Sequence, residues 1–178
     1  MRAGPVRWYR LVMGVAKALD AARAALRGEP GPRVLPRRDD AAVVAFLVTL
    51  ARPEGDLAIP LRAGRNLVGR GSGREPPYSW PEPPAVEQGQ WCIACDARGA
   101  EVWDAASTNL SVLLPRARVA GLDLGQGVAG FLRLFEAPGA VRLPHPNEPS
   151  DRHRYPLAEG DVLRSCYATF VFGWLVSS

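Results

Sequence analysis

The sequence predicts a mostly β protein, a sandwich of two antiparallel sheets that is preceded by an α-helical extension. From residue 41 onward, short apolar runs rich in β-branched and aromatic residues recur, and the 18 glycines and 17 prolines largely punctuate them. Before residue 41 the apolar residues follow a helical spacing instead. A length of 178 residues with 47% hydrophobic residues allows one folded domain and an appendage.

The helix is predicted over residues 6–27, where apolar side chains recur at i, i+3, i+4 and i+7 and build one stripe. The stripe consists of Trp8, Leu11, Val12, Val15, Ala18, Leu19, Ala22, Ala25 and Leu26. Gly28 follows at a C-cap position, and Pro30 and Pro32 prevent continuation of the helix. Residues 28–40 are therefore predicted to be a linker, or an arm that lies over the domain.

The two parts of the chain are expected to be an extension over residues 1–40 and a sandwich over residues 41–178. Strands are predicted at residues 43–50, 57–61, 66–70, 91–95, 101–104, 111–114, 162–164 and 168–176. The proline-rich residues 71–85 are expected to form a long loop.

Residues 115–154 are expected to be a long insertion in the sandwich. Within it, residues 131–135 and 140–143 have the composition of a hairpin. Residues 144–154 are polar and are expected to be exposed.

The charge of the chain is distributed unevenly. Residues 1–38 carry nine basic and two acidic side chains, a net charge of +7, whereas residues 39–178 have a net charge of −3. Three interpretations of the basic helix remain open: packing on its own domain, binding of a partner protein or a second copy, and adsorption to an anionic membrane. The partner-binding interpretation uses Trp8, Leu11, Val12, Val15 and Leu19. An alanine-rich apolar face disfavours the membrane, and nucleic acid is not expected because no groove-reading pattern accompanies the charge.

A cytoplasmic protein is expected, because charged residues interrupt the N-terminus and nothing approaches the roughly 18 consecutive apolar residues of a membrane span. Cys92 and Cys95 lie three apart on a predicted strand and so point to opposite faces, which suits neither a metal site nor a redox pair. We expect buried cysteines and no metal.

An enzyme is not expected. The two histidines, His145 and His153, stand in a polar segment, and the sequence has neither a Gly-x-Ser-x-Gly nor a Gly-x-x-x-x-Gly-Lys motif. No catalytic residue and no cofactor are therefore predicted.

Three segments, in order, resemble motifs of the forkhead-associated (FHA) family. Residues 67–70, Leu-Val-Gly-Arg, end a strand just before a loop. Residues 102–111, Val-Trp-Asp-Ala-Ala-Ser-Thr-Asn-Leu-Ser, resemble the family's turn with Ser-x-Asn-Gly-Thr. Residues 157–163 with the strand at 170–172 resemble its Leu-x-x-Gly-Asp-x-Ile turn and closing strand. The resemblance spans about residues 42–176.

The resemblance implies a phosphothreonine-peptide adaptor in Ser/Thr-kinase signalling. Arg70 would face the phosphate, where its guanidinium can make paired charge-assisted hydrogen bonds. The implied peptide site continues with Ser107, Thr108 and Asn109, of which the Thr108 hydroxyl would meet the phosphate and the Asn109 amide the peptide backbone. Asp161 is expected to bind backbone amides rather than a ligand.

Four positions depart from the family pattern. Glu87 and Gln90 stand where the family has a phosphate-binding Ser and a loop-bracing His, and Ala106 and Leu110 stand where glycines are usual. At ~5 Å and an effective dielectric of ~20, a carboxylate repels each unit of phosphate charge by about 3 kcal/mol, which offsets the gain from Arg70. The alternative is therefore a degenerate FHA scaffold or assembly protein that binds partners without phosphate, through the helix and the insertion.

Overall fold

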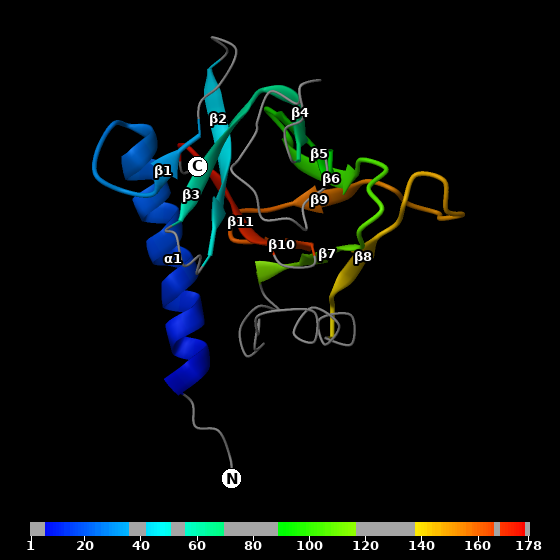
Figure 1. The fold of residues 1–178 in the computed structure, drawn as a ribbon, viewed down its shortest axis with the longest axis horizontal. Helices are drawn as coiled ribbons and strands as arrows, with labels where there is room; N and C mark the ends of the chain where they lie inside the picture. The colour runs from blue at the N-terminus through cyan, green and yellow to red at the C-terminus, as the bar shows by residue number, and fades with distance from the viewer. Residues whose placement is uncertain are drawn as a thin grey trace.

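The computed structural model describes residues 6–35, 42–50, 56–69, 89–116, 138–165 and 168–176, and within them the side chains of residues 6–13 and 168 are not described. The described residues form one helix and eleven strands (Figure 1). These are α1 (Val6–Leu26), β1 (Arg33–Val34), β2 (Val43–Thr49), β3 (Leu57–Arg62), β4 (Gly64–Val68), β5 (Trp91–Asp96), β6 (Gly99–Asp104), β7 (Ser111–Leu114), β8 (Val141–Leu143), β9 (Tyr155–Leu157), β10 (Val162–Ser165) and β11 (Ala168–Trp174).

The strands form two sheets, which confirms the predicted β-sandwich with an N-terminal helix. One sheet has the order β1-β3-β2-β11-β10-β7-β8, and the other has the order β4-β5-β6-β9. All pairs but one are antiparallel: β1 runs parallel to β3, with Arg33 opposite Leu57. The larger sheet is therefore antiparallel apart from the two-residue edge strand β1, which the sequence did not predict.

The edge strand β1 lies within the segment predicted as a linker or arm. The Leu35 N–H donates to the Ala58 carbonyl at 2.9 Å, and the Arg33 N–H donates to the Asp56 carbonyl at 3.1 Å. The Leu35 side chain is buried in the core. The segment behaves as an arm, because an apolar residue among its prolines gains burial by pairing along the sheet edge.

The eight predicted strands are observed, although β4 spans Gly64–Val68 where residues 66–70 were predicted. β9 was not predicted, because it is only three residues long and contains Pro156, which is tolerated where β9 forms the edge of its sheet. β8 pairs with β7 in the structure, whereas residues 131–135, its predicted hairpin partner, lie outside the described residues. Most of residues 144–154 are exposed, as predicted.

The main core lies between the two sheets and is built on aromatic side chains. The Trp91 and Phe170 rings meet edge to face, with centroids 5.3 Å apart, and join the two sheets. Cys95 belongs to this core, and Cys92 is buried on the opposite face of β5, as the strand spacing predicted. Burial raises the pKa of the Cys95 thiol to about 12, so this cysteine is a buried apolar residue at neutral pH.

Helix α1 packs on the outer face of the larger sheet, against β2, β3 and β11 (Figure 1). Val15, Leu19 and Ala22 are buried there with Phe46 and other apolar side chains of the sheet. A Cβ atom at Gly173 would lie 2.7 Å from Leu19 Cδ2, so a glycine in β11 is needed for this close approach.

The helix is also anchored by a charged side chain near its end. The Arg23 guanidinium forms an ion pair with Glu159 at 2.7 Å, and its Nε donates to the Trp174 carbonyl at 3.0 Å. The chain's own domain thus occupies Val15 and Leu19, two of the five residues assigned to partner binding, and this packing makes them unavailable to a separate partner. The side chains of Trp8, Leu11 and Val12 lie outside the described residues.

No described helix is long and apolar enough to cross a membrane. No group of three or more His, Cys, Asp or Glu side chains among these residues is arranged to hold a metal ion.

Candidate functional site

Three strand ends meet at one end of the smaller sheet. Val68 at the end of β4 pairs with Trp91 at the start of β5, and Trp91 pairs with Asp104 at the end of β6. The chain therefore leaves the sheet after β4 beside the turn that follows β6. Arg70, two residues beyond Val68, and Glu87 lie outside the described residues.

The turn between β6 and β7 is closed by the Asp104 carboxylate. Its Oδ1 accepts from the Ser107 N–H at 2.9 Å, and its Oδ2 accepts from the Ser107 hydroxyl at 2.8 Å. The Ser111 hydroxyl lies 3.3 Å from the same Oδ2. Ser107 is only 6% exposed, so this predicted ligand lies in the base of the turn, where it braces the turn from within.

Gln90 joins this turn to the residue that enters β5. Its fully buried side chain places Nε2 2.9 Å from the Ser107 hydroxyl, 2.6 Å from the Ser111 hydroxyl and 3.2 Å from the Asn109 carbonyl. The Ala105 N–H also donates to the Gln90 carbonyl at 3.2 Å. The residue at the position of the family's bracing histidine therefore braces the same kind of turn with a neutral amide.

The other two departures also have visible consequences. Ala106 has a φ of 66°, in the left-handed region that favours glycine. Leu110 is 43% exposed and places an apolar side chain at the rim of the turn. Thus Ala106 strains the turn where the family has glycine, and Leu110 changes its surface.

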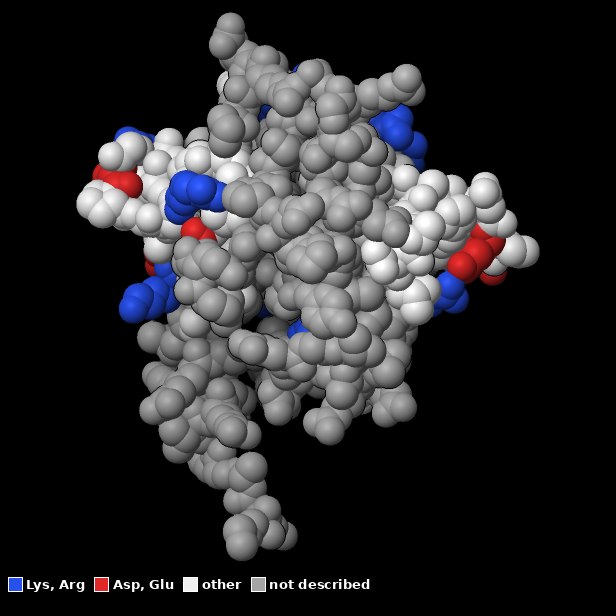
Figure 2. All heavy atoms as spheres, viewed as in Figure 1, with Lys and Arg blue, Asp and Glu red and all other residues white. Residues whose placement is uncertain are grey.

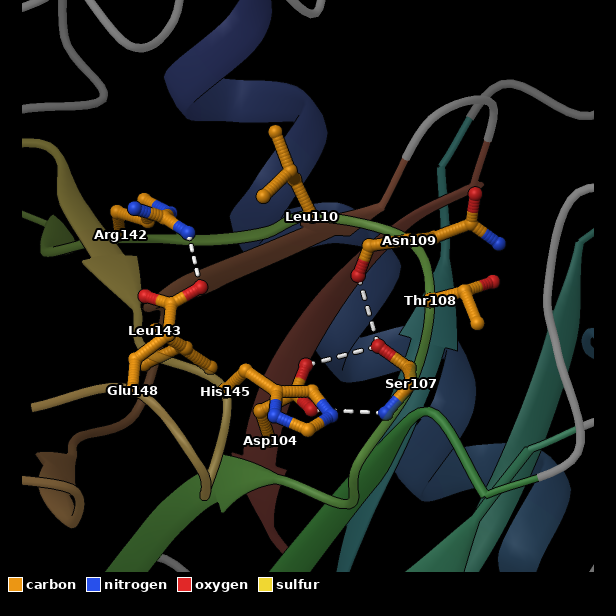
Figure 3. A pocket seen from close by; sticks show the side chains of 9 residues that line it. All are labelled: Asp104, Ser107, Thr108, Asn109, Leu110, Arg142, Leu143, His145 and Glu148. Atoms are coloured by element: carbon orange, nitrogen blue, oxygen red, sulfur yellow. Dashed lines mark hydrogen bonds and ion pairs between the residues drawn. The ribbon is translucent and has the colours of Figure 1, made fainter.

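Thr108 is exposed and Asn109 is half-buried at the top of the turn. Their side chains point away from the pair formed by Arg142 and Glu148 on the other side of the turn (Figure 3). Two of the predicted peptide-binding residues, Thr108 and Asn109, therefore lie on a turn that buried side chains hold in place.

A pocket of about 200 Å³ lies between the turn and the segment after β8; Thr108 and Asn109 contribute to its lining, although their side chains point away from Arg142 and Glu148 (Figure 3). β8 pairs with β7 so that Leu143 stands opposite Ser111. The segment that follows Leu143 therefore runs beside the turn that precedes Ser111 and forms the second wall. Sequence reasoning named residues of the turn but missed the second wall, because that wall comes from a polar segment and only the register of β7 and β8 brings it to the turn.

The described charges on the face seen in Figure 2 lie in mixed groups, with basic and acidic side chains near one another at both sides. Among the residues that the structure describes, this face shows no continuous patch of one sign.

Asp161 has the structural role that the sequence predicted. Its Oδ1 accepts from the Arg116 N–H at 2.6 Å, and its Oδ2 accepts from the Ala158 N–H at 2.8 Å. It joins the end of β7 to the turn between β9 and β10 and holds no position in the candidate site.

Comparison with known proteins adds similarity to solved structures. Neither a protein-family model nor a curated protein matches the sequence. An FHA domain of an Arabidopsis thaliana hypothetical protein is 18% identical and has a TM-score of 0.47, with 77% of this chain and 89% of that chain covered. The yeast Dun1 FHA domain, solved with a doubly phosphorylated peptide, is 13% identical with a TM-score of 0.47, and 80% and 82% of the chains are covered. The FhaA FHA domain, solved with the intracellular domain of Rv3910, is 20% identical with a TM-score of 0.43, and 72% and 98% are covered. These three structures are FHA domains, the family that the sequence motifs resemble.

Proposed function

We propose that this chain is a non-catalytic interaction module that binds a phosphothreonine-containing segment of a protein partner, as an adaptor in Ser/Thr-kinase signalling. The observation that carries the proposal is the meeting of strand ends at the smaller sheet, where Val68, Trp91 and Asp104 adjoin. Arg70 follows the first of these strands by two residues, and Thr108 and Asn109 belong to the turn after the last.

The chemistry of these three side chains suits a phosphorylated peptide. A phosphate carries about −1.5 to −2 charges at neutral pH and has three strong acceptor oxygens. The Arg70 guanidinium supplies a paired donor, and the Thr108 hydroxyl supplies a second one. The Asn109 amide supplies a donor and an acceptor for the peptide backbone. A turn braced by the buried Gln90 side chain loses little freedom on binding, which favours affinity.

The proposal is tested by titrating a phosphothreonine peptide library with the wild type and with Arg70→Ala. We expect the variant to bind at least tenfold more weakly, because it loses a charge-assisted contact. Arg98→Ala is the matched control, since Arg98 is exposed in the β5–β6 hairpin at the other end of the same sheet, and it should bind as the wild type does. If no peptide binds more tightly than roughly 1 mM, or if Arg70→Ala changes nothing, the phosphate reader is excluded.

Glu87 supplies a further arm of the same experiment. The Glu87→Gln variant removes a carboxylate from the position at which the family has a phosphate-binding serine. A tighter complex in this variant indicates that Glu87 opposes phosphate. Unchanged affinity indicates that its carboxylate points away from the site.

The second candidate is a scaffold that binds a partner, or a second copy of itself, without phosphate. The supporting observation is that α1 runs past the ends of β2 and β3 (Figure 1), and that Val15 is the first buried residue among those of α1 whose side chains the structure describes. The turns that precede Val15 contain Trp8, Leu11 and Val12. If the chain self-associates through this part of the helix, replacing these three residues with Asp should make it monomeric in light scattering. A wild type that is monomeric at all concentrations tested excludes self-association.

A further inference from the structure

The pocket between the β6–β7 turn and the segment after β8 has its own chemistry. It is lined by Asp104, Ser107, Thr108, Asn109, Leu110, Arg142, Leu143, His145 and Glu148 (Figure 3). Its volume of about 200 Å³ is smaller than the roughly 300–1,000 Å³ of sites for whole small-molecule ligands. A single side chain of a partner is the size of group that this pocket can admit.

The charges around the pocket favour a cation. Two carboxylates, Asp104 and Glu148, and one guanidinium, Arg142, line it. The guanidinium is already committed, since Arg142 Nη2 lies 2.5 Å from Glu148 Oε1. An incoming anion would have to break this ion pair and face the Asp104 carboxylate, whereas a cation meets one more carboxylate than guanidinium among the described lining residues.

One carboxylate oxygen of the pocket, Oε2 of Glu148, is placed to accept a hydrogen bond from a bound cation. The Asp104 oxygens already accept from Ser107 and Ser111 within the turn, so Asp104 contributes charge rather than a lone pair. Among the described residues, the hydrogen bond to Glu148 uses only its Oε1. Its Oε2 is therefore the acceptor that an incoming ammonium or guanidinium would use.

The remaining walls suit the stem of a long cationic side chain. Leu110 is exposed at the rim, and Leu143 is buried in the wall. His145 Nδ1 accepts from the Asn147 N–H at 3.2 Å, which fixes the imidazole ring at the pocket. Methylene groups pack against the leucines, and a planar guanidinium can stack on a fixed ring.

We propose that this pocket binds an arginine side chain of a partner protein, through Glu148, His145 and Leu110. Thr108 and Asn109 contribute to the lining of the pocket, but their side chains point away from Arg142 and Glu148 (Figure 3). The arginine would therefore be held by other side chains than those proposed to bind the phosphothreonine segment. A partner that contacts both sides of the turn would present an arginine to one side and its phosphothreonine to the other.

The test uses N-acetyl-arginine methylamide as the probe, titrated into the full chain and followed by the backbone amide NMR signals of Leu110 and His145. N-acetyl-norleucine methylamide, which has a similar stem without charge, is the control probe. We expect the arginine probe to bind with a millimolar dissociation constant and to shift these signals, and the norleucine probe to bind at least threefold more weakly.

Two substitutions with opposite expected effects sharpen the test. Glu148→Gln removes the acceptor charge and frees Arg142, and should weaken the arginine probe about two- to fivefold. Arg142→Gln removes the competing cation, and should strengthen it by a similar factor. Both residues are about half exposed, so both variants are expected to fold.

The proposal is overturned if arginine and norleucine probes bind alike, or if the two substitutions change arginine binding in the same direction. Neither outcome bears on the phosphopeptide titration, because the probe contains no phosphate. Phosphopeptide binding without arginine binding would exclude the pocket alone, and the reverse result would exclude the phosphate reader alone.

Discussion

At the scale of single residues, the turn after β6 is controlled by side chains beneath it. Gln90, Asp104, Ser107 and Ser111 form a buried network that leaves Thr108 and Asn109 at the surface. A buried polar network is stable only when its members satisfy one another, since each unpaired group costs about 1–3 kcal/mol. The shape of the binding surface therefore depends on residues that would not touch a ligand.

The first prediction concerns Gln90. Replacing it with Ala leaves buried hydroxyls and a carbonyl without their shared donor, and should lower the free energy of unfolding by about 2 to 4 kcal/mol. Gln90→His should lose less, because an imidazole N–H can still donate to the turn. Urea unfolding measures both, and equal losses in the two variants would argue against the hydrogen bonds as the cause.

The second prediction concerns Ala106. An L-residue in the left-handed region is strained by about 1–2 kcal/mol, which glycine relieves. Ala106→Gly should therefore raise the free energy of unfolding by about 0.5 to 1 kcal/mol after the added freedom of the unfolded chain is counted. Ala105→Gly is the matched control, since among the described non-glycine residues Ala106 alone has a positive φ, and it should be destabilising. A loss of stability in both variants would contradict the strain.

At the scale of elements, a charged side chain near the end of α1 joins the helix to the β9–β10 turn, in addition to the apolar packing on the sheet. Arg23 lies over the Phe46 ring, with its Cζ 5.9 Å from the ring centroid, in addition to its contacts with Glu159 and Trp174. Its side chain is only 12% exposed. Removing one partner of an ion pair with this burial costs more than removing one partner of a solvent-exposed pair, because a partly buried charge is left unpaired.

The third prediction compares two arginines of the same helical region. Arg23→Ala should lower the free energy of unfolding by about 1 to 3 kcal/mol, because it leaves a partly buried carboxylate and a carbonyl without their donor. Arg27→Ala should change it by less than about 0.5 kcal/mol, since Arg27 and Glu29 are both largely exposed. Equal effects in thermal or urea unfolding would show that Arg23 does not anchor the helix.

The fourth prediction concerns the pH dependence due to Asp161. Burial raises the pKa of this carboxyl above 3.8, although the hydrogen bonds from Ala158 and Arg116 oppose the shift. The folded state then binds more protons than the unfolded state, so the contribution of this group to stability falls as the pH rises from 3.8 through the raised pKa.

The stability of the wild type relative to Asp161→Asn should accordingly increase as the pH is lowered from about 7 towards about 4, since Asn does not titrate. Urea unfolding at several pH values measures the difference between the two proteins. A difference that stays constant over this range would show that the pKa of Asp161 is not raised in the folded protein.

At the scale of the whole molecule, the extension is part of the folded domain. The helix buries Val15, Leu19 and Ala22, and β1 extends the larger sheet. Both elements cover apolar surface that the sandwich would otherwise expose to water.

The fifth prediction follows from this arrangement. Removing residues 1–35 should uncover Phe46 and its apolar neighbours on the larger sheet, and the truncated chain should aggregate or unfold at a lower temperature. Light scattering and thermal unfolding measure these effects. A truncated chain that stays monomeric with an unchanged Tm would show that the helix does not contribute to the stability of the domain.

The local sequence was sufficient to predict the helix, most strands and the turn that contains Thr108 and Asn109. Helical and alternating periodicities report directly which residues face a core, and the pattern at residues 168–176 predicted the last strand, which the structure has as β11. Pattern also showed that Cys92 and Cys95 would lie on opposite faces of one strand.

Only the tertiary structure showed which buried side chains support this turn and that a pocket lies beside it. Gln90 could be named as a departure, but its partners lie 17 to 21 residues away and are brought near by the pairing of β5 with β6. Likewise, the pocket with Arg142 and Glu148 exists because β8 pairs with β7 in one register. Periodicity specifies which face of an element is buried, whereas contacts between distant residues depend on strand order and register, which no local pattern contains.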